Sequence, residues 1–221
     1  MRLRKIPFFV LVPLLLLGLG LIQQQNRPVV TRSVGLADAF DFPFEPDGGE
    51  RPPWYASYDV QNPYLTSHSR CYDTTVSQLR HAGEDWFRPG GSEVHAIANG
   101  RVVYLVPDWD HGDAIVIEHP LKEGWQTPWG DEVVYSLYLH LDSEVQEGEQ
   151  VARGQVIGHL QPWEYNSHLH LEIRRYADMA VALRCPASGK TWLVGPSYVD
   201  EAKSPYSYGY LNPQEWIESH R

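Results

Sequence analysis

The sequence predicts a mainly β protein built around a small antiparallel sheet. Three observations support this prediction: 18 Gly and 17 Pro are spread through 221 residues, only 2 Met occur, and strong helical periodicity is absent. Short apolar or alternating runs separated by turn residues recur instead, which is typical of antiparallel strands. Hydrophobic residues make up 43% of the chain, with 8 Trp and 13 Tyr, so there is enough apolar surface for a core.

The first 22 residues are typical of an export segment. Arg2, Arg4 and Lys5 form a positively charged start, and an uncharged, Leu-rich run follows at residues 6–22. This run is at the lower limit for a membrane span, so both an uncleaved anchor in the inner membrane and a cleaved signal peptide stay open. In either case the rest of the chain is exported. We therefore expect an extracytoplasmic protein of the cell envelope, either membrane-anchored or secreted.

Residues 23–63 are predicted to be a tether followed by an extended segment. They are rich in Pro, Asp and Gly and show neither a helical nor a strand period. The aromatic side chains of this segment predict that part of it packs on the domain: Phe40, Phe42, Phe44, Trp54 and Tyr55. Residues 64–221 then form one domain, because a chain of this length has room for one domain plus extensions.

The charge of the chain excludes one class of partner. Residues 1–34 hold five basic and no acidic side chains, so the remainder carries 13 basic against 28 acidic residues, a net charge of −15. Such a body repels phosphates, and no basic patch with interleaved aromatic residues occurs. We therefore expect no nucleic-acid partner.

The two cysteines, Cys71 and Cys185, are far apart in the sequence. An even number of cysteines in an exported protein favours a disulfide. Because the closed loop would exceed a hundred residues, the bridge would stabilise the fold by about 4–5 kcal/mol in the chain-entropy model. The alternative is two unrelated, partly buried thiols.

A hairpin and four further strands are predicted within the domain. Residues 93–98 and 101–106 are predicted to pair, because Asn-Gly at 99–100 is the favoured pair for a two-residue turn with positive φ at both positions. The other predicted strands are residues 114–118, 132–141, 155–160 and 168–174, and a short helical turn is predicted at residues 212–219.

Two histidine patterns are candidates for a metal site. In HAGED (residues 81–85), His81 and Asp85 are four residues apart and can meet at one metal in a bent loop or irregular strand. In HLHLE (residues 168–172), side chains alternate across a strand, so His168, His170 and Glu172 share one face. Residues 169, 171 and 173 then form the core face. Each pattern alone also fits ordinary surface side chains.

His140 is the third candidate, at the end of VYSLYLH (residues 134–140). The same alternation predicts that Leu137 and Leu139 face away from it. A catalytic zinc site commonly uses three protein ligands and leaves one position for water, whose pKa falls from 15.7 to about 7. Two further histidines beside the metal can accept the proton of this water and stabilise an oxyanion. Four histidines and one aspartate match these needs.

The order and spacing of six sequence blocks resemble those of the lysostaphin/LytM-type zinc endopeptidases. The resemblance covers roughly residues 79–174, with a weaker tail to residue 217. Its blocks are HAGEDW (81–86), VHAIANGRVV (94–103), DAIVIEH (113–119), YSLYLHL (135–141), VQEGEQVARGQVIG (145–158) and SHLHLEI (167–173).

This resemblance implies a role for each of the five groups. His81, Asp85 and His170 fall on the zinc ligands, with one Zn²⁺ per chain, and His140 and His168 fall on the two catalytic histidines. The implied fold is a small antiparallel sheet lining an open groove, with the metal on its floor. The implied activity is a zinc-dependent endopeptidase, in which zinc-activated water attacks a peptide carbonyl in peptidoglycan cross-links or stems.

The chain departs from the family in the loop QPWEYNS (residues 161–167), which replaces a Gly- and Thr-rich stretch found in many members. Its Trp163 and Tyr165 either form a stacking wall for the substrate or pack the loop. The remaining candidates are expected to be structural. Glu84 is expected to be a solvated side chain, with support of a metal ligand as the alternative. His119 is not expected to bind the metal, and the histidines at positions 95, 111 and 159 are expected to be surface or hydrogen-bonded side chains.

Three alternatives to the peptidase fit the sequence less well. A catalytically silent module that binds cell wall or regulates another wall hydrolase usually lacks a ligand residue, and all five groups are present here. A different metal hydrolase could use His168 and His170, but the body is too short for an amidohydrolase barrel of about 250 residues, and the His-Glu-x-x-His helix of the common helical zinc proteases is absent. A purely structural envelope protein would leave the clustered candidate ligands as a coincidence.

Overall fold

The computed structural model describes residues 35–44, 60–65, 67–68, 79–108, 111–163, 166–178, 182–184, 191–193, 198–200 and 205–221. The export segment, Cys71 and Cys185 lie outside these residues, so the anchor and the disulfide stay predictions. No helix among the described residues is long and apolar enough to cross a membrane.

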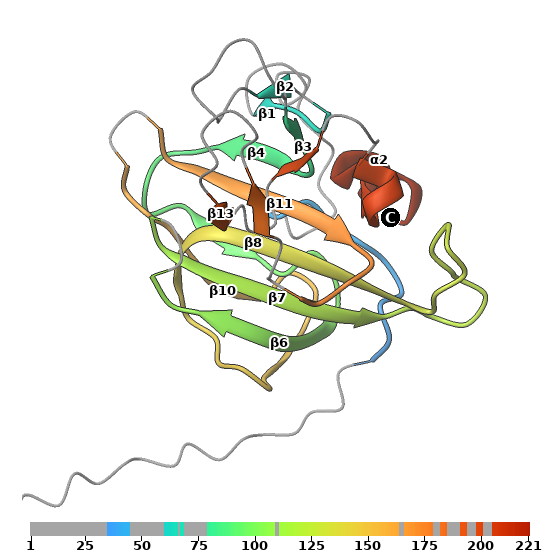
Figure 1. Cartoon of the computed structure of the whole chain (residues 1–221). Helices are drawn as coiled ribbons and strands as arrows, with labels where there is room; N and C mark the ends of the chain where they lie inside the picture. The colour runs from blue at the N-terminus through green and yellow to red at the C-terminus, as the bar shows by residue number, and fades with distance from the viewer. Residues whose placement is uncertain are drawn as a thin grey trace, which may run out of the picture. The chain divides into compact units, whose positions relative to one another are not determined.

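The domain is built on an antiparallel sheet of ten strands, which confirms the predicted mainly β fold (Figure 1). Its main order is β1 (Val60–Asn62), β4 (Glu84–Phe87), β11 (His168–Arg174), β8 (Val133–Ser143), β7 (Asp113–Pro120), β6 (Gly100–Val106) and β9 (Gln150–Val151). In addition, β10 (Val156–Leu160) pairs with β8 and with β5 (Glu93–His95), and β15 (Tyr210–Leu211) pairs with β11.

Smaller elements complete the described chain. The strands β14 (Tyr198–Asp200), β3 (Leu79–His81) and β2 (Ser67–His68) form a second sheet, and β12 (Ala182–Arg184) pairs with β13 (Thr191–Leu193). A 3₁₀ turn, η1 (Pro205–Tyr208), precedes β15, and the chain ends in α2 (Pro213–Ser219). The Asn212 side chain accepts a hydrogen bond from the amide of Glu215, which caps the start of α2.

The four strands predicted after residue 113 are observed as β7, β8, β10 and β11, and the predicted helical turn is α2. Apolar alternation explains the orientation of β11: Leu169, Leu171 and Ile173 lie in the main core, as predicted for one face of this strand. The helix α2 contributes Trp216 and Ile217 to the same core.

The hairpin predicted around Asn99 and Gly100 is wrong. β5 pairs with β10, whereas β6 pairs with β7 and β9, and neither Asn99 nor Gly100 has a positive φ. The Asn99 side chain instead accepts a hydrogen bond from the amide of Arg153 (2.9 Å). A Cβ atom at Gly100 would lie 2.4 Å from the carbonyl oxygen of Glu118 on β7. Glycine is therefore required here for close strand approach, and not for a turn.

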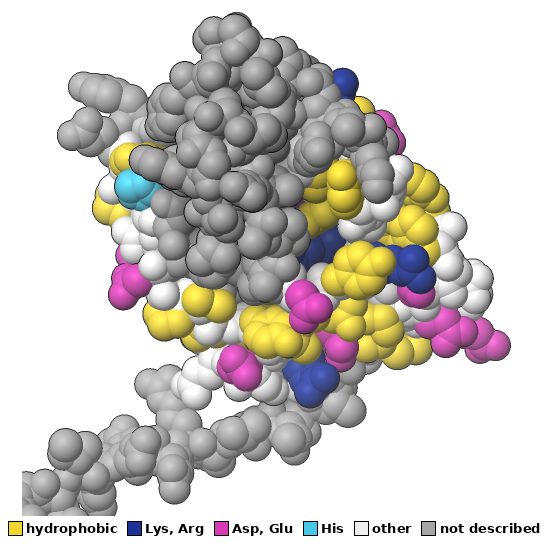
Figure 2. All heavy atoms as spheres, viewed as in Figure 1, with side chains coloured by type: hydrophobic (Ala, Val, Ile, Leu, Met, Phe, Trp, Pro, Cys, Tyr) yellow, Lys and Arg dark blue, Asp and Glu magenta, His cyan; other side chains and the backbone are white. Residues whose placement is uncertain are grey.

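Residues 35–44 pack against the domain. Ala37 forms a parallel bridge with Leu121, and Phe40 and Phe42 are fully buried in the main core. Further along, the amide of Asp41 donates to the carbonyl of Ile97 (2.8 Å). Phe40 and Phe42 thus confirm that part of this segment packs on the domain, whereas Trp54 and Tyr55 lie outside the described residues. On the described surface of Figure 2, Lys and Arg side chains are interspersed with hydrophobic and acidic ones.

Candidate metal centre

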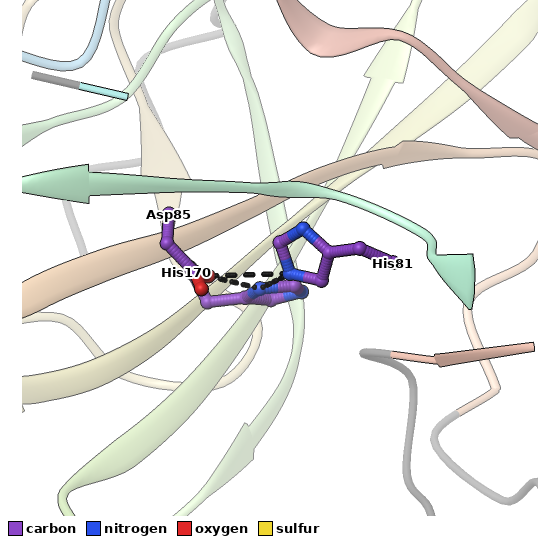
Figure 3. Close-up of side chains that lie close together, drawn as sticks. All are labelled: His81, Asp85 and His170. Carbon is purple, nitrogen blue, oxygen red and sulfur yellow. Dashed lines mark hydrogen bonds and ion pairs between the residues drawn. The ribbon is translucent and has the colours of Figure 1, made fainter. Parts of the chain in front are cut away.

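Three elements bring the candidate ligands together (Figure 3). His81 is the last residue of β3, the chain bends at residues 82–83, and Asp85 lies in β4. β4 pairs with β11 so that Asp85 is directly opposite His170. Directly opposite residues of an antiparallel pair point to the same face, so these two side chains meet beside His81. Asp85 and His170 therefore share one site, although 85 positions separate them in the sequence.

Gly83 permits this bend. A Cβ atom there would lie 2.4 Å from the carbonyl oxygen of Leu171, 2.8 Å from Cε1 of His170 and 2.9 Å from Cγ of Glu172. Backbone and ring atoms at these distances cannot shift aside, so a larger residue would push β11 or its side chains out of place. Gly83 therefore keeps His81 and Asp85 close to His170 of β11.

The ligand atoms of the three residues converge. Asp85 Oδ1 lies 2.8 Å from His170 Nδ1 and 3.3 Å from His81 Nε2, and the two nitrogens are 3.0 Å apart. All three side chains are buried, and their ligand atoms lie within 4.8 Å of one another. Two imidazole nitrogens and one carboxylate oxygen are a donor set that zinc takes in catalytic sites, where a fourth position stays open. The residues therefore fit a zinc ion.

Burial and hydrogen bonding set the charge of this cluster. Burial raises the pKa of Asp85, but hydrogen bonds to His170 and His81 outweigh it and hold the pKa well below its usual value. For His170, burial lowers the pKa, whereas hydrogen bonds to Asp85 and Glu172 raise it to about 9. Before a metal binds, the cluster therefore pairs an ionised carboxylate with a positively charged imidazole, and a metal ion must displace a proton from His170 to bind.

Two polar residues outside the predicted site support the ligands. Asn62 in β1 donates from Nδ2 to Asp85 Oδ2 (2.6 Å), and Glu172 Oε1 accepts from His170 Nε2 (3.0 Å). The alternation of β11 already placed Glu172 on the face of the histidines, and this signal could have identified it. No local signal points to Asn62, because it reaches Asp85 through pairing of β1 with β4.

His140 reaches the site through a β-bulge. On β7, Asp113 pairs with Leu141 and the next residue, Ala114, pairs with Leu139, so His140 is an extra residue on β8. Its φ is 71°, which is uncommon for a residue other than glycine. The ring of His140 lies 4.7 Å from that of His168, between centroids.

The expectation that Leu139 and His140 face opposite sides is therefore wrong. Leu139 is directly opposite His170 and points to the same face as that ligand candidate. Regular alternation would turn His140 to the other face, but the bulge turns it back beside His168. The described structure thus brings all five candidate residues to one side of the sheet.

His168 is held by contacts on several sides. Its Nδ1 donates to the carbonyl oxygen of Asn166 (2.6 Å), and the Phe87 ring stacks on it at 5.0 Å. Its Nε2 lies 3.9 Å from Asp85 Oδ1. Burial lowers the pKa of His168, which favours a neutral ring. Trp163 stacks on the same ring at 5.8 Å, so the loop that departs from the family pattern contacts this histidine directly.

Three of the other histidines have structural partners. His119 is fully buried between the Asn99 carbonyl (2.9 Å) and the Ser136 hydroxyl (2.7 Å). His95 contacts the carbonyl of Pro43 at 3.1 Å, and His159 pairs with a glutamate at 3.2 Å. The expectation of a solvated Glu84 is wrong: this side chain is buried, because Glu84 is opposite Leu171 and points to the core side of the sheet.

Fold and site together define an antiparallel β-sheet protein with a buried His-Asp-His cluster suited to a metal ion. Residues 79–182 match the profile of peptidase family M23. This part of the chain belongs to that family, which confirms the resemblance seen in the sequence blocks. The match ends within β12 and includes every candidate ligand and catalytic residue.

Several solved structures are similar to this chain. A zinc-containing peptidase from Vibrio cholerae is 25% identical over 62% of this chain and 37% of its own, with a TM-score of 0.44. The catalytic domain of lysostaphin from Staphylococcus simulans is 19% identical over 75% of this chain and 96% of its own (TM-score 0.44). CbpA from L. salivarius REN is 19% identical over 82% and 96% (TM-score 0.47).

The chain spans only part of some of these relatives. It covers 37% of the Vibrio cholerae peptidase and 47% of a second structure, from Pseudomonas aeruginosa. No curated protein sequence matches the chain.

Proposed function

We propose that this protein is a zinc-dependent endopeptidase that hydrolyses peptide bonds in the cross-links or stems of peptidoglycan. The arrangement of five groups carries this proposal: the buried cluster of His81, Asp85 and His170, with the rings of His168 and His140 beside it. Family membership of residues 79–182 supports a peptidase. The export segment and the family resemblance support a substrate in the cell wall.

His81, Asp85 and His170 would hold one zinc ion per chain, through the three atoms that already converge. Zinc in such a site supplies Lewis acidity, which activates water and polarises the scissile carbonyl. An uncleaved N-terminal segment would tether the enzyme to the inner membrane, and a cleaved one would release it outside the cytoplasm.

His168 would act as the proton acceptor. Because its Nδ1 donates to the carbonyl of Asn166, the lone pair is on Nε2, which faces the cluster at 3.9 Å from Asp85. Burial lowers its pKa, so the ring is neutral at neutral pH and able to take a proton. His140, on the adjacent side, would stabilise the oxyanion or return a proton to the leaving amine.

Digestion of purified peptidoglycan tests this function. We expect new amino termini without new reducing sugar ends, loss of the reaction on adding a chelator, and its return with zinc. New reducing ends would instead indicate cleavage of glycosidic bonds. Binding to the wall without either product would support the catalytically silent module.

A further inference from the structure

Glu172 contacts the side of His170 that faces away from the cluster. The Nδ1 atom of His170 lies 2.8 Å from Asp85 Oδ1 and 3.0 Å from His81 Nε2, so this nitrogen belongs to the metal cluster. The other nitrogen, Nε2, lies 3.0 Å from Glu172 Oε1. Glu172 is fully buried, and its carboxylate is separated from the cluster by the imidazole ring.

This contact fixes a proton on Nε2 of His170. An ionised carboxylate only accepts hydrogen bonds, so Nε2 must carry the proton that it donates to Glu172. Nδ1 also lies 2.8 Å from a carboxylate, that of Asp85, so the metal-free ring can carry a proton on both nitrogens. A metal ion that binds Nδ1 would replace the proton there, whereas the hydrogen bond to Glu172 would keep the proton on Nε2.

Arg174 supports the carboxylate from behind. It is two residues along β11 and points to the same face, with Nη1 at 3.5 Å from Glu172 Oε2. Its Nη2 donates to the carbonyl of Ala177 (2.9 Å), and the whole side chain is buried. A guanidinium keeps its charge in proteins, so it offsets the buried negative charge of Glu172. Alternate residues of β11 thus form one row: His168, His170, Glu172 and Arg174.

We propose that Glu172 is a positioning residue that holds His170 in the tautomer and orientation needed to bind metal through Nδ1, with Arg174 supporting its charge. This inference rests on the proposed function. Carboxylate partners of metal-binding histidines orient the ring, and their loss typically weakens metal binding by about 10- to 100-fold. The same loss is expected here for zinc.

Zinc affinity of the full chain, measured by competition with a chromophoric chelator, tests this proposal. We expect Glu172→Gln to bind zinc about 10- to 100-fold more weakly than the wild type. Glu118→Gln is the matched control, because this carboxylate also pairs with an arginine of the sheet (Arg101, 3.2 Å) and contacts no histidine of the site. It should bind zinc as the wild type does. Equal affinity of all three proteins would overturn the role of Glu172.

Two outcomes separate this inference from the proposed function. A wild-type chain that binds no zinc would contradict the proposed function itself. A wild-type chain that binds one zinc, with unchanged affinity in Glu172→Gln, would contradict only the inference.

A spectroscopic measurement needs no variant and therefore does not depend on Glu172→Gln folding. In the zinc-loaded wild type, ¹H–¹⁵N correlation of the imidazole should show His170 protonated at Nε2 and metal-bound at Nδ1. The opposite pattern, with the proton on Nδ1, would overturn the proposal.

Discussion

The ring of His140 lies 4.7 Å from the ring of His168 because His140 is the extra residue of a bulge in β8, with a φ of 71°. Bulges beside functional sites commonly re-aim a side chain, and a left-handed backbone at a residue other than glycine carries a conformational penalty. The strand thus gives up local stability to place a second histidine beside the candidate metal centre.

Replacement of His140 tests this backbone conformation. His140→Gly and His140→Ala both remove the ring, so we expect both to lose most peptidase activity and to keep zinc. They should differ in stability: the glycine variant should be about 1 kcal/mol more stable in urea unfolding, because only glycine adopts a positive φ without steric conflict. An alanine variant as stable as the glycine variant would show that the left-handed conformation is not retained.

Trp163 should affect catalysis and not metal binding. Its ring stacks on His111 at 3.9 Å and lies 5.9 Å from His140 and 5.8 Å from His168. We expect Trp163→Ala to lower kcat/KM by about 10- to 100-fold, because small displacements of catalytic groups have effects of this size. Zinc content should not change.

The control for Trp163 is Trp129→Ala. Trp129 stacks on Tyr206 at 5.2 Å, in the connection between β7 and β8, and should have little effect on turnover. Equal activity of both variants and the wild type would indicate that Trp163 only packs its loop.

The sequence predicted most of the sheet because its strands have strong local signals. Alternation in residues 168–174 placed His168, His170 and Glu172 on one face and the leucines in the core, as observed. The block order also placed His81 and Asp85 next to the histidine of β11. The first feature follows from the two-residue alternation of side chains along a strand, and the second follows from the spacing of the sequence blocks that resemble the family. Both can be read directly from the sequence.

The features that the sequence did not predict depend on contacts between residues far apart in the chain. Asn99 and Gly100 have the composition of a tight turn, but close approach to Glu118 on β7 decides the role of the glycine. Similarly, nothing in the local sequence announces a bulge at His140. Asn62 contacts Asp85 only because β1 pairs with β4. Glu172 acts as a partner of His170 only because Nδ1 of that ring, and not Nε2, faces the cluster.

His119 predicts a pH dependence of stability. Burial lowers its folded-state pKa to about 4, whereas an unfolded histidine has a pKa of about 6.5. Between these values the unfolded chain binds a proton that the folded protein does not, so stability falls as the pH falls. Between pH 7 and pH 5 the loss should be about 2 kcal/mol.

Urea unfolding of the wild type and His119→Gln at both pH values isolates this contribution. Other titrating groups are shared by the two proteins, so their effects cancel in the difference. The variant should lose about 2 kcal/mol less than the wild type on acidification. If acidification lowered the stability of the wild type and of His119→Gln equally, His119 would not be the buried neutral group.

Metal removal should lower thermal stability. A ligand present at about a thousand times its Kd stabilises the folded state by about 4 kcal/mol, which corresponds to a shift in Tm of about 10 °C for a domain of this size. We therefore expect a chelator to lower the Tm of the zinc-loaded protein by this amount. The Tm of His170→Ala should not respond to the chelator, and a response as large as that of the wild type would place the metal elsewhere.

Zinc content and peptidoglycan cleavage, measured together in the wild type, His170→Ala and His168→Ala, test the central claim most directly. The wild type should hold one zinc per chain and release peptides. His170→Ala should lose both properties, whereas His168→Ala should keep the zinc and lose about 100-fold or more of the activity. Full zinc occupancy in His170→Ala, or wild-type cleavage by His168→Ala, would contradict the assignment of these two histidines.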